Sequence, residues 1–424
     1  MRNQDYLPRI IDKAVESHLK TFGAVCIEGA KWCGKTWTAN IHSNSSIYLG
    51  DPAGNFQNKS LAKIDPKLVL EGDSPRLIDE WQEVPELWDA VRFEVDQRGR
   101  KGQFILTGSA TPAQKGILHS GAGRISTLRM RPMSLFESKD STGQISFEDI
   151  CNGNYKNIGV NEVSLDRVIN LTIRGGWPGS LDIESSDYTV LAREYLNATI
   201  NHDIYRLEGI NRNTRKMNLL LRSLARNEST TVSMSTLRRD IREHEEDDLD
   251  GDTISTYLTL FERMFLIENQ KAFSSNIRSS TRLKKLDKRH FVDPSLACAL
   301  LNATPKMLIN DLNTLGFLFE ALCERDLRIY AESFNAKLYH YQDYDGDEID
   351  SVVELENGDW IAIEIKLGSN QIDEAANALI RIKNKILDDG GKPPKVMCVV
   401  CGICKAAYLR DDGVYVVPIT ALKP

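Results

Sequence analysis

The sequence contains no run of about 18 uncharged apolar residues, which is the length that a membrane-spanning helix requires. Its first residues lack the basic and then apolar pattern of a secretory signal peptide. Cysteine is scarce, with 8 in 424 residues, which excludes a disulfide scaffold. No repeat of about 20–50 residues occurs, which excludes a solenoid. These absences predict a cytoplasmic protein with reduced thiols.

The charges are nearly balanced, because 53 Lys and Arg face 60 Asp and Glu and leave a net charge of −7. This balance excludes a protein that attracts nucleic acid over its whole surface, so any such contact requires a local basic patch. The apolar fraction of 41% is typical of globular proteins, and 424 residues predict about two to four domains.

A phosphate-binding pattern follows the strand-like apolar run at 22–28. Residues 29–36 read G-A-K-W-C-G-K-T, which matches G-x-x-x-x-G-K-T. In this pattern the backbone N–H groups surround phosphate oxygens, Lys35 reaches the β- and γ-phosphates, and the Thr36 hydroxyl binds Mg²⁺. The alternative is a glycine-containing loop that matches by chance. The predicted nucleotide-binding residues are Gly29, Ala30, Lys31, Trp32, Cys33, Gly34, Lys35, Thr36 and Trp37.

Two carboxylates end a second strand-like run at 76–80. We expect Asp79 to hold the hydrated Mg²⁺ and Glu80 to act as the general base that polarises the attacking water. The alternative is an acidic strand end that caps the following helix. The sequence therefore predicts phosphoryl hydrolysis, with Lys35 and Glu80 among the catalytic residues.

Two further catalytic residues are predicted downstream. A third strand at 103–106 leads into Thr107, whose hydroxyl we expect to sense the γ-phosphate beside Glu80; a simple turn is the alternative. The glycine loop at 121–124 carries Arg124, which we expect to act as a finger on a neighbouring subunit in a homo-oligomer. A plain surface arginine is the alternative.

These segments, in this order, resemble the AAA-type P-loop ATPases of a prokaryotic group, and the resemblance covers residues 5–140. It implies ATP and Mg²⁺ as cofactors and ATP hydrolysis as the activity. Lys31 and Trp32 depart from the Arg-Gln pair expected of that family. The stretches that carry the resemblance, besides 29–36, are Leu77-Ile78-Asp79-Glu80-Trp81-Gln82, Leu106-Thr107-Gly108-Ser109 and Gly123-Arg124.

The middle of the chain predicts a linker and helical connector at 141–230 and a winged-helix domain at 231–305. A helix at 253–264 is the expected recognition helix, and the basic segment 278–290 is the expected wing on DNA or RNA phosphates. A structural spacer is the alternative, because the acidic loop at 245–252 repels phosphate. The predicted phosphate contacts are Arg278, Arg282, Lys284, Lys285, Lys288 and Arg289.

A β-hairpin is predicted at 348–366. A two-residue turn would place Asp350 and Glu364 on opposite faces, since side chains alternate along a strand. A three-residue turn at 356–358, with Gly358 in the left-handed conformation, sets Asp350 directly across from Glu364. We therefore predict the three-residue turn.

Asp350 and Glu364 are then placed to chelate Mg²⁺ while Lys366 positions water or stabilises phosphorane charge. With Glu320 on a preceding helix, this pattern resembles the PD-(D/E)xK restriction-endonuclease-like superfamily. The whole chain resembles AAA ATPases that carry such a C-terminal domain. An inactive domain, in which Glu364 and Lys366 form an ion pair, is the alternative.

The expected fold class is α/β, with a P-loop AAA-type ATPase core at 1–140, a winged-helix middle and a restriction-endonuclease-like α/β domain at 306–424. The expected function is that of an ATP-hydrolysing switch or motor that acts on nucleic acid, with metal-dependent cleavage in the C-terminal domain. The alternative is a signalling or defence ATPase whose inactive C-terminal half binds a protein partner.

Overall fold

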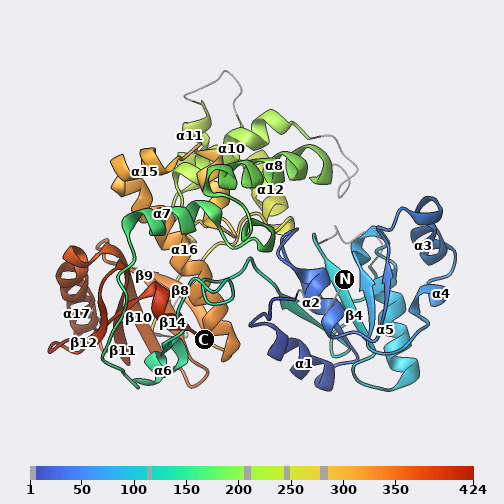
Figure 1. Ribbon diagram of the computed structural model, residues 1–424, viewed down its shortest axis with the longest axis horizontal. Helices are drawn as coiled ribbons and strands as arrows, with labels where there is room; N and C mark the ends of the chain where they lie inside the picture. Colours follow the sequence, from blue (N-terminus) through green and yellow to red (C-terminus); the bar gives the residue numbers. More distant parts are fainter. Residues whose placement is uncertain (1–5, 112–116, 205–211, 243–248, 277–284) are drawn as a thin grey trace. The chain divides into compact units, whose positions relative to one another are not determined.

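The computed structural model describes residues 6–111, 117–204, 212–242, 249–276 and 285–424. The chain divides into two compact units (Figure 1). The first consists of the described residues within 1–132, 201–212 and 259–266, and the second of those within 133–200, 213–258 and 267–424. No helix in this described part of the chain is long and apolar enough to span a membrane.

The first unit is built on a five-stranded parallel sheet of order β2-β3-β4-β1-β5. Since β4 lies between β1 and β3, the carboxyl ends of these three strands meet at one edge of the sheet. The elements are α1 (Asp12–Thr21), β1 (Ala24–Glu28), α2 (Lys35–Ile41), β2 (Ser45–Tyr48), α3 (Ala53–Ile64), α4 (Lys67–Leu70), β3 (Arg76–Asp79), α5 (Leu87–Arg98), β4 (Phe104–Gly108) and β5 (Ile125–Arg129).

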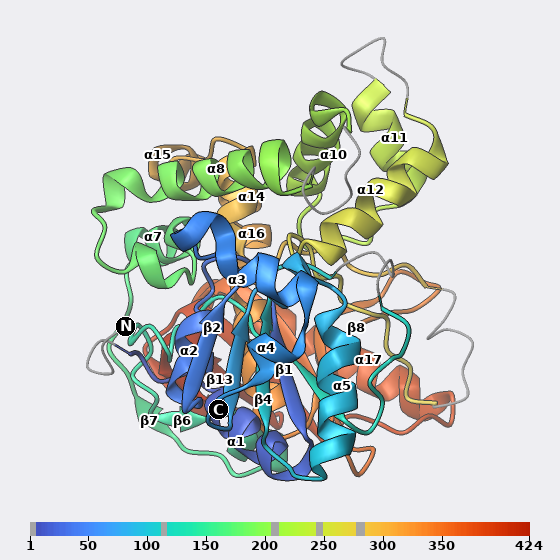
Figure 2. The same ribbon diagram turned by 90° about the vertical axis from the view of Figure 1, so that its right-hand side faces the viewer.

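Helices cover both faces of this sheet, which explains why β1 is apolar from Ala24 to Ile27 and β4 from Phe104 to Leu106, without alternation. Helices α3, α4 and α5 pack on one face, where Val91 meets Cys26 and Leu106 in one buried cluster. Helices α1 and α2 pack on the other face, where Val15 and Ala39 share a cluster with Val25. Figure 2 shows α5 on one side of the strands and α2 on the other.

The second unit contains a seven-stranded sheet of order β7-β12-β13-β11-β10-β9-β8. Strands β8, β9 and β10 are antiparallel neighbours, and β10 and β11 are parallel and joined by α17. The elements of this sheet from residue 312 onward, with its helices, are α16 (Leu312–Ser333), β8 (Lys337–Gln342), β9 (Glu348–Glu354), β10 (Trp360–Gly368), α17 (Ile372–Asp388), β11 (Val396–Ile403), β12 (Ala406–Leu409) and β13 (Val414–Pro418). Strand β14 (Leu422–Lys423) follows and lies outside this sheet.

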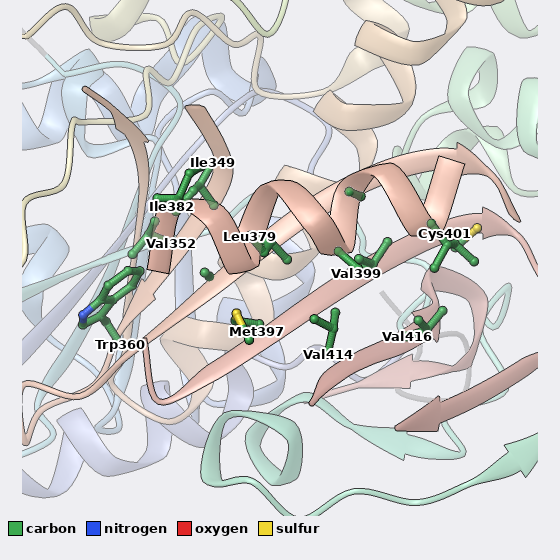
Figure 3. Packing of buried hydrophobic residues seen from close by; sticks show 14 of the residues in the cluster. Ile349, Val352, Trp360, Leu379, Ile382, Met397, Val399, Cys401, Val414 and Val416 are labelled. Atoms are coloured by element: carbon green, nitrogen blue, oxygen red, sulfur yellow. The ribbon is translucent and has the colours of Figure 1, made fainter. Parts of the chain in front are cut away.

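Helix α17 covers one face of this sheet, and α16 contacts the other. Figure 3 shows Leu379 and Ile382 of α17 directed at the strands that carry Val352, Met397 and Val399. Both the helix surface and the strand surface of this core are apolar. A charged side chain on β9 or β10 is therefore stable only near a strand end or with a buried partner.

The remaining helices of the second unit precede this sheet in the sequence. Helix α14 packs against α7, α8, α10 and α16, and α10 also contacts α11. Helix α12 contributes its residues from 259 onward to the first unit. Their bounds are α7 (Leu165–Arg174), α8 (Tyr188–Ala198), α10 (Thr214–Arg226), α11 (Met234–Arg242), α12 (Gly251–Arg263), α14 (Pro294–Leu300) and α15 (Pro305–Asn310).

The sequence predicts a linker and helical connector at 141–230, but the first part of this segment pairs with C-terminal strands. Strand β6 (Ile145–Ser146) pairs with β14, and β7 (Ile158–Gly159) pairs with β12, with α6 (Phe147–Asn152) between them. The abundance of Gly, Asn and Ser in this stretch reflects short strands and turns. Strand β7 is therefore an edge strand of the seven-stranded sheet, and β6 forms a separate two-stranded sheet with β14.

Short antiparallel bridges follow α12. Ile267 pairs with Phe291, Gln270 with Lys288, and Thr230 with Arg289. Ala272 also forms a parallel bridge with His340 of β8. We call residues 267–273 and 286–291 the bridging hairpin, because they connect the helices of the second unit to the edge of its sheet.

Candidate functional sites

The loop between β1 and α2 has the backbone that a phosphate site requires. A Cβ atom at position 29 would lie 2.0 Å from the Met130 carbonyl oxygen, so only glycine fits there. Gly34 has a φ of 105°, a conformation that side chains disfavour, and α2 begins directly after it. Arg9 holds the loop from outside, since its guanidinium donates to the carbonyl oxygens of Cys33 (2.6 Å) and Arg131 (2.8 Å).

Lys35 is buried at the start of α2, and its Nζ donates to the Ala30 carbonyl oxygen at 2.8 Å. This bond places the ammonium inside the loop. Trp32, at the loop's outer bend, is 59% exposed and has a φ of 65°. Most of the indole surface is therefore in contact with solvent.

Asp79, at the end of β3, joins two hydroxyl groups from neighbouring segments. Its Oδ1 accepts from Thr36 Oγ1 at 2.8 Å and from Thr107 Oγ1 at 2.7 Å. Thr107 Oγ1 in turn accepts from the Glu80 backbone N–H at 3.0 Å. Burial raises the pKa of Asp79, and the two hydroxyl bonds partly oppose this rise. The structure thus brings together three of the predicted residues.

Glu80 adopts a left-handed conformation, with φ 59° and ψ 47°, which directs its carboxylate away from the strand. Its Oε2 accepts from Ser109 Oγ at 2.7 Å and from the Gln82 amide. The Gln82 amide also lies 3.1 Å from Ser109 Oγ. Gln82 and Ser109 belong to the two motifs noted in the sequence, but the motifs alone did not predict that both side chains hold the Glu80 carboxylate.

A residue far along the chain contacts the phosphate loop. Lys31 Nζ lies 2.6 Å from Asp203 Oδ1, and both residues belong to the first unit. In the same unit, the Thr111 N–H donates to the Arg263 carbonyl oxygen at 3.0 Å. Asp203 was missed, because 172 residues separate it from Lys31 and no local pattern links them.

Arg124 lies at the opposite edge of the sheet. Strand β5 runs parallel to β1 and pairs Ile125 with Ala24, so the preceding Arg124 is at the amino end of the strands. Its Nε donates to Asp96 at 2.9 Å, and the side chain is 47% exposed. Arg124 therefore cannot reach the phosphate loop of its own chain.

The second candidate site begins at the β9–β10 turn, where the three-residue loop is confirmed. Leu355 N–H donates to Asp359 O at 2.9 Å, and Gly358 has a φ of 76°. The strand register pairs Ile363 with Ser351, and the same register sets Asp350 across from Glu364. Both carboxylates therefore lie on one face of the hairpin, as predicted.

Lys366 joins these two carboxylates. Its Nζ lies 2.7 Å from Glu364 Oε2 and 3.5 Å from Asp350 Oδ2. Asp350 Oδ2 also accepts the Ile365 backbone N–H at 2.8 Å. The predicted residues thus converge, with Lys366 ion-paired rather than directed at solvent.

A second lysine, from the bridging hairpin, completes this cluster. Lys288 Nζ lies 2.6 Å from Glu320 Oε1 of α16 and 3.8 Å from Asp350 Oδ1, and its side chain is 3% exposed. The prediction that Lys288 contacts nucleic-acid phosphates is therefore wrong, because a buried ammonium cannot reach a phosphate backbone. The missed signal was the alternation of the hairpin, which turns this side chain inward.

Of the other predicted phosphate contacts, Lys285 and Arg289 lie in the described part of the chain and three lie outside it. Lys285 Nζ donates to the Asp343 carbonyl oxygen at 2.6 Å and lies 4.3 Å from the centre of the Tyr344 ring. The backbone of Arg289 pairs with Thr230. The predicted contacts that lie outside the described residues are Arg278, Arg282 and Lys284.

Burial dominates the electrostatics of this second site. It raises the pKa of Glu320 to about 8 and that of Glu364 to about 7, against the opposing effect of the lysines. Burial lowers the pKa of Lys288, but Glu320 and Asp350 outweigh it and raise this pKa overall. Among the described residues, no group of three or more His, Cys, Asp or Glu side chains is arranged to hold a metal ion.

Comparison with known proteins assigns the first unit. Residues 21–139 match a family model described as an AAA domain. This part of the chain is similar to AAA-type P-loop domains. Two domains of unknown function match the rest, DUF8612 over residues 165–307 and DUF4143 over residues 315–422. The AAA domain thus contains Lys35, Asp79 and Thr107, and DUF4143 contains the second carboxylate site.

Whole-chain relatives are more distant. The chain is 23% identical over 346 residues to the uncharacterized protein Rv2008c of Mycobacterium tuberculosis. The aligned residues make up 81% of this chain and 70% of the relative. The uncharacterized protein Mb2031c of Mycobacterium bovis gives the same values. Among solved structures, the Walker-type ATPase PABY2304 of Pyrococcus abyssi is 15% identical, with a TM-score of 0.43, over 71% of this chain and 97% of that one.

Proposed function

We propose that this protein is a Mg²⁺-dependent ATPase whose AAA domain works as a switch. The observation that carries the proposal is the Asp79 carboxylate, which accepts from Thr36 on the phosphate loop and from Thr107 on the neighbouring strand. These oxygens are ligands that Mg²⁺ prefers, and Lys35 lies in the same loop. The residues present therefore fit a Mg²⁺-nucleotide.

In the proposed mechanism, the loop N–H groups and Lys35 bind the β- and γ-phosphates. Thr36 and Asp79 would hold a hydrated Mg²⁺ ion, which would supply positive charge to offset the charge that develops on the phosphates. Glu80 accepts a proton from the attacking water, and Thr107 positions the Glu80 backbone through its bond to that N–H. Ser109 and Gln82 hold the Glu80 carboxylate until water and nucleotide are in place.

The proposal divides the rest of the chain as predicted, with a winged-helix-like region at 231–305 and a nuclease-like domain at 306–424. The order of α11, α12 and the bridging hairpin supports the first. The order α16, β8, β9, β10, α17, β11 supports the second. A cytoplasmic location, where ATP is abundant, belongs to the same proposal.

We further propose that this C-terminal half passes the nucleotide state to a protein partner. The contacts of Lys285 and Lys288 favour this function over cleavage of nucleic acid, since both ammonium groups are bound within the chain. Stimulation of turnover by a nucleic acid is the competing outcome, and the experiment below separates the two.

The test is ATP turnover by the full-length protein with Mg²⁺, alone and with duplex DNA, single-stranded DNA or RNA. We expect Lys35→Ala to abolish turnover and Glu80→Gln to retain ATP binding while losing about 100-fold or more in rate, since it removes the general base. Wild-type turnover equal to that of Lys35→Ala contradicts the ATPase proposal. Stimulation by one of the polymers contradicts the protein-partner proposal and restores nucleic acid as the partner.

A further inference from the structure

We propose that Lys288 is the resident cation of the C-terminal carboxylate cluster, so that this nuclease-like site takes no divalent metal ion. We define the cluster as Glu320, Asp350 and Glu364 with the ammonium groups of Lys288 and Lys366. The carboxylates lie in the segment that matches DUF4143 and Lys288 in the segment that matches DUF8612, and the inference does not depend on ATP hydrolysis.

The position of the Lys288 ammonium is the first argument. Its Nζ lies 2.6 Å from Glu320 Oε1 and 3.8 Å from Asp350 Oδ1, between one carboxylate of α16 and one of β9. A Mg²⁺ ion bound to the same two oxygens would need distances of about 2.0–2.1 Å to each. The ammonium and the metal ion therefore require the same space.

Charge is the second argument. The three carboxylates face two ammonium groups, since Lys366 Nζ lies 2.7 Å from Glu364 and 3.5 Å from Asp350. Addition of a divalent cation would give the cluster an excess of positive charge in a buried place, which is costly. Glu364 pairs with Lys366, and Asp350 lies near both Lys366 and Lys288, so neither hairpin carboxylate is left to a metal ion alone.

The place of Lys288 in the fold is the third argument. Its backbone pairs with Gln270, whose side-chain amide donates to the Tyr339 carbonyl oxygen of β8 at 2.8 Å. Phe273 N–H donates to His340 O at 2.7 Å, and His340 N–H donates to Lys271 O at 3.0 Å. The bridging hairpin is thus bonded to the sheet edge next to the cluster, and Lys288 is held where the ammonium bonds to Glu320.

The experiment is a calorimetric titration of the full-length, nucleotide-free protein with Mn²⁺. Any binding at the phosphate loop occurs equally in wild type and in Asp350→Asn, so the difference between the two reports the C-terminal cluster. We expect identical stoichiometry for both. An Mn²⁺ ion bound by wild type and lost in Asp350→Asn would overturn the proposal. Glu364→Gln serves as the second variant if Asp350→Asn does not fold.

Removal of the lysine provides the complementary test. Lys288→Met keeps the length of the side chain and leaves Glu320 and Asp350 without the ammonium, so we expect one additional Mn²⁺ per chain. This gain should disappear in Lys288→Met/Asp350→Asn. A folded Lys288→Met variant without added Mn²⁺ binding contradicts the proposal, and an unfolded one leaves the decision to the comparison of wild type with Asp350→Asn. ATP turnover, measured separately, reports failure of the proposed ATPase function.

Discussion

At the scale of single residues, the phosphate loop of the AAA domain is tied to a residue that lies far away in the sequence. Lys31 and Asp203 form a 2.6 Å ion pair in which Lys31 is 38% and Asp203 13% exposed. Partly exposed pairs contribute little stability, since water screens them. We expect this pair to position the phosphate loop instead, because it fixes the Lys31 side chain two residues after Gly29.

A charge exchange tests this role. We expect Lys31→Asp and Asp203→Lys each to raise the KM for ATP by up to about fivefold, which corresponds to about 1 kcal/mol, because the loop loses its anchor. The double variant should restore KM. The control is Lys63→Asp, an exposed substitution on α3. A double variant as impaired as the sum of the two single variants would show that the pair does not position the loop.

At the scale of elements, the bridging hairpin, α16 and the β9–β10 hairpin meet at buried charges. The pKa of Glu320 is raised by burial to about 8 from an ordinary value of 4.5, and Lys288, Asp350 and Lys366 are its charged neighbours. Between these two pH values the folded chain binds more protons than the unfolded chain. The free energy of unfolding must therefore fall as the pH rises through this interval.

The measurement is the melting temperature of wild type and Glu320→Gln between pH 5 and pH 8. We expect wild type to lose stability with rising pH and Glu320→Gln to lose less, since each pKa unit corresponds to about 1.4 kcal/mol. Glu364, whose pKa is raised to about 7, contributes the same sign and leaves a residual slope. The raised pKa values of the lysines act only at higher pH. Parallel curves for wild type and Glu320→Gln, with the exposed Glu374→Gln as control, would contradict this account.

At the scale of the whole molecule, the sheet order of the AAA domain decides where an arginine can act. Arg124 and the phosphate loop lie at opposite ends of parallel strands, separated by about 13 Å along β1 at about 3.3 Å per residue. An arginine finger at Arg124 can therefore serve only the site of another copy of the chain. This geometry makes assembly the condition for its proposed role.

Turnover per chain should accordingly rise with protein concentration. We expect Arg124→Ala to remove this dependence and to retain only the low rate of the separate chain, because arginine fingers stabilise charge in the transition state. Arg100→Ala, an exposed change near the end of α5, is the matched control. Arg124→Ala turnover equal to wild type at every concentration would exclude the trans-acting role.

Part of this protein follows from local sequence. The meeting of Thr36, Asp79 and Thr107 could be predicted, because Thr36 lies at the start of the helix after the β1 loop, Asp79 ends β3 and Thr107 is the second-last residue of β4. Parallel strands place these carboxyl ends at one edge of the sheet. The opposition of Asp350 and Glu364 also followed, because a three-residue turn with Gly358 admits one register. In both cases the geometry depends on a few adjacent residues and on the two-residue period of strands.

The tertiary structure alone decided the rest. Lys288 lies in a basic segment, so the sequence predicted an exposed side chain that contacts phosphates. Its ammonium is instead buried against Glu320, because the bridging hairpin runs along the sheet edge. Asp203 reaches Lys31 across 172 residues, and residues 141–160 form strands with the far end of the chain. Such contacts depend on how segments that are distant in the sequence pack together. The periodicity of residues within one segment does not predict this packing.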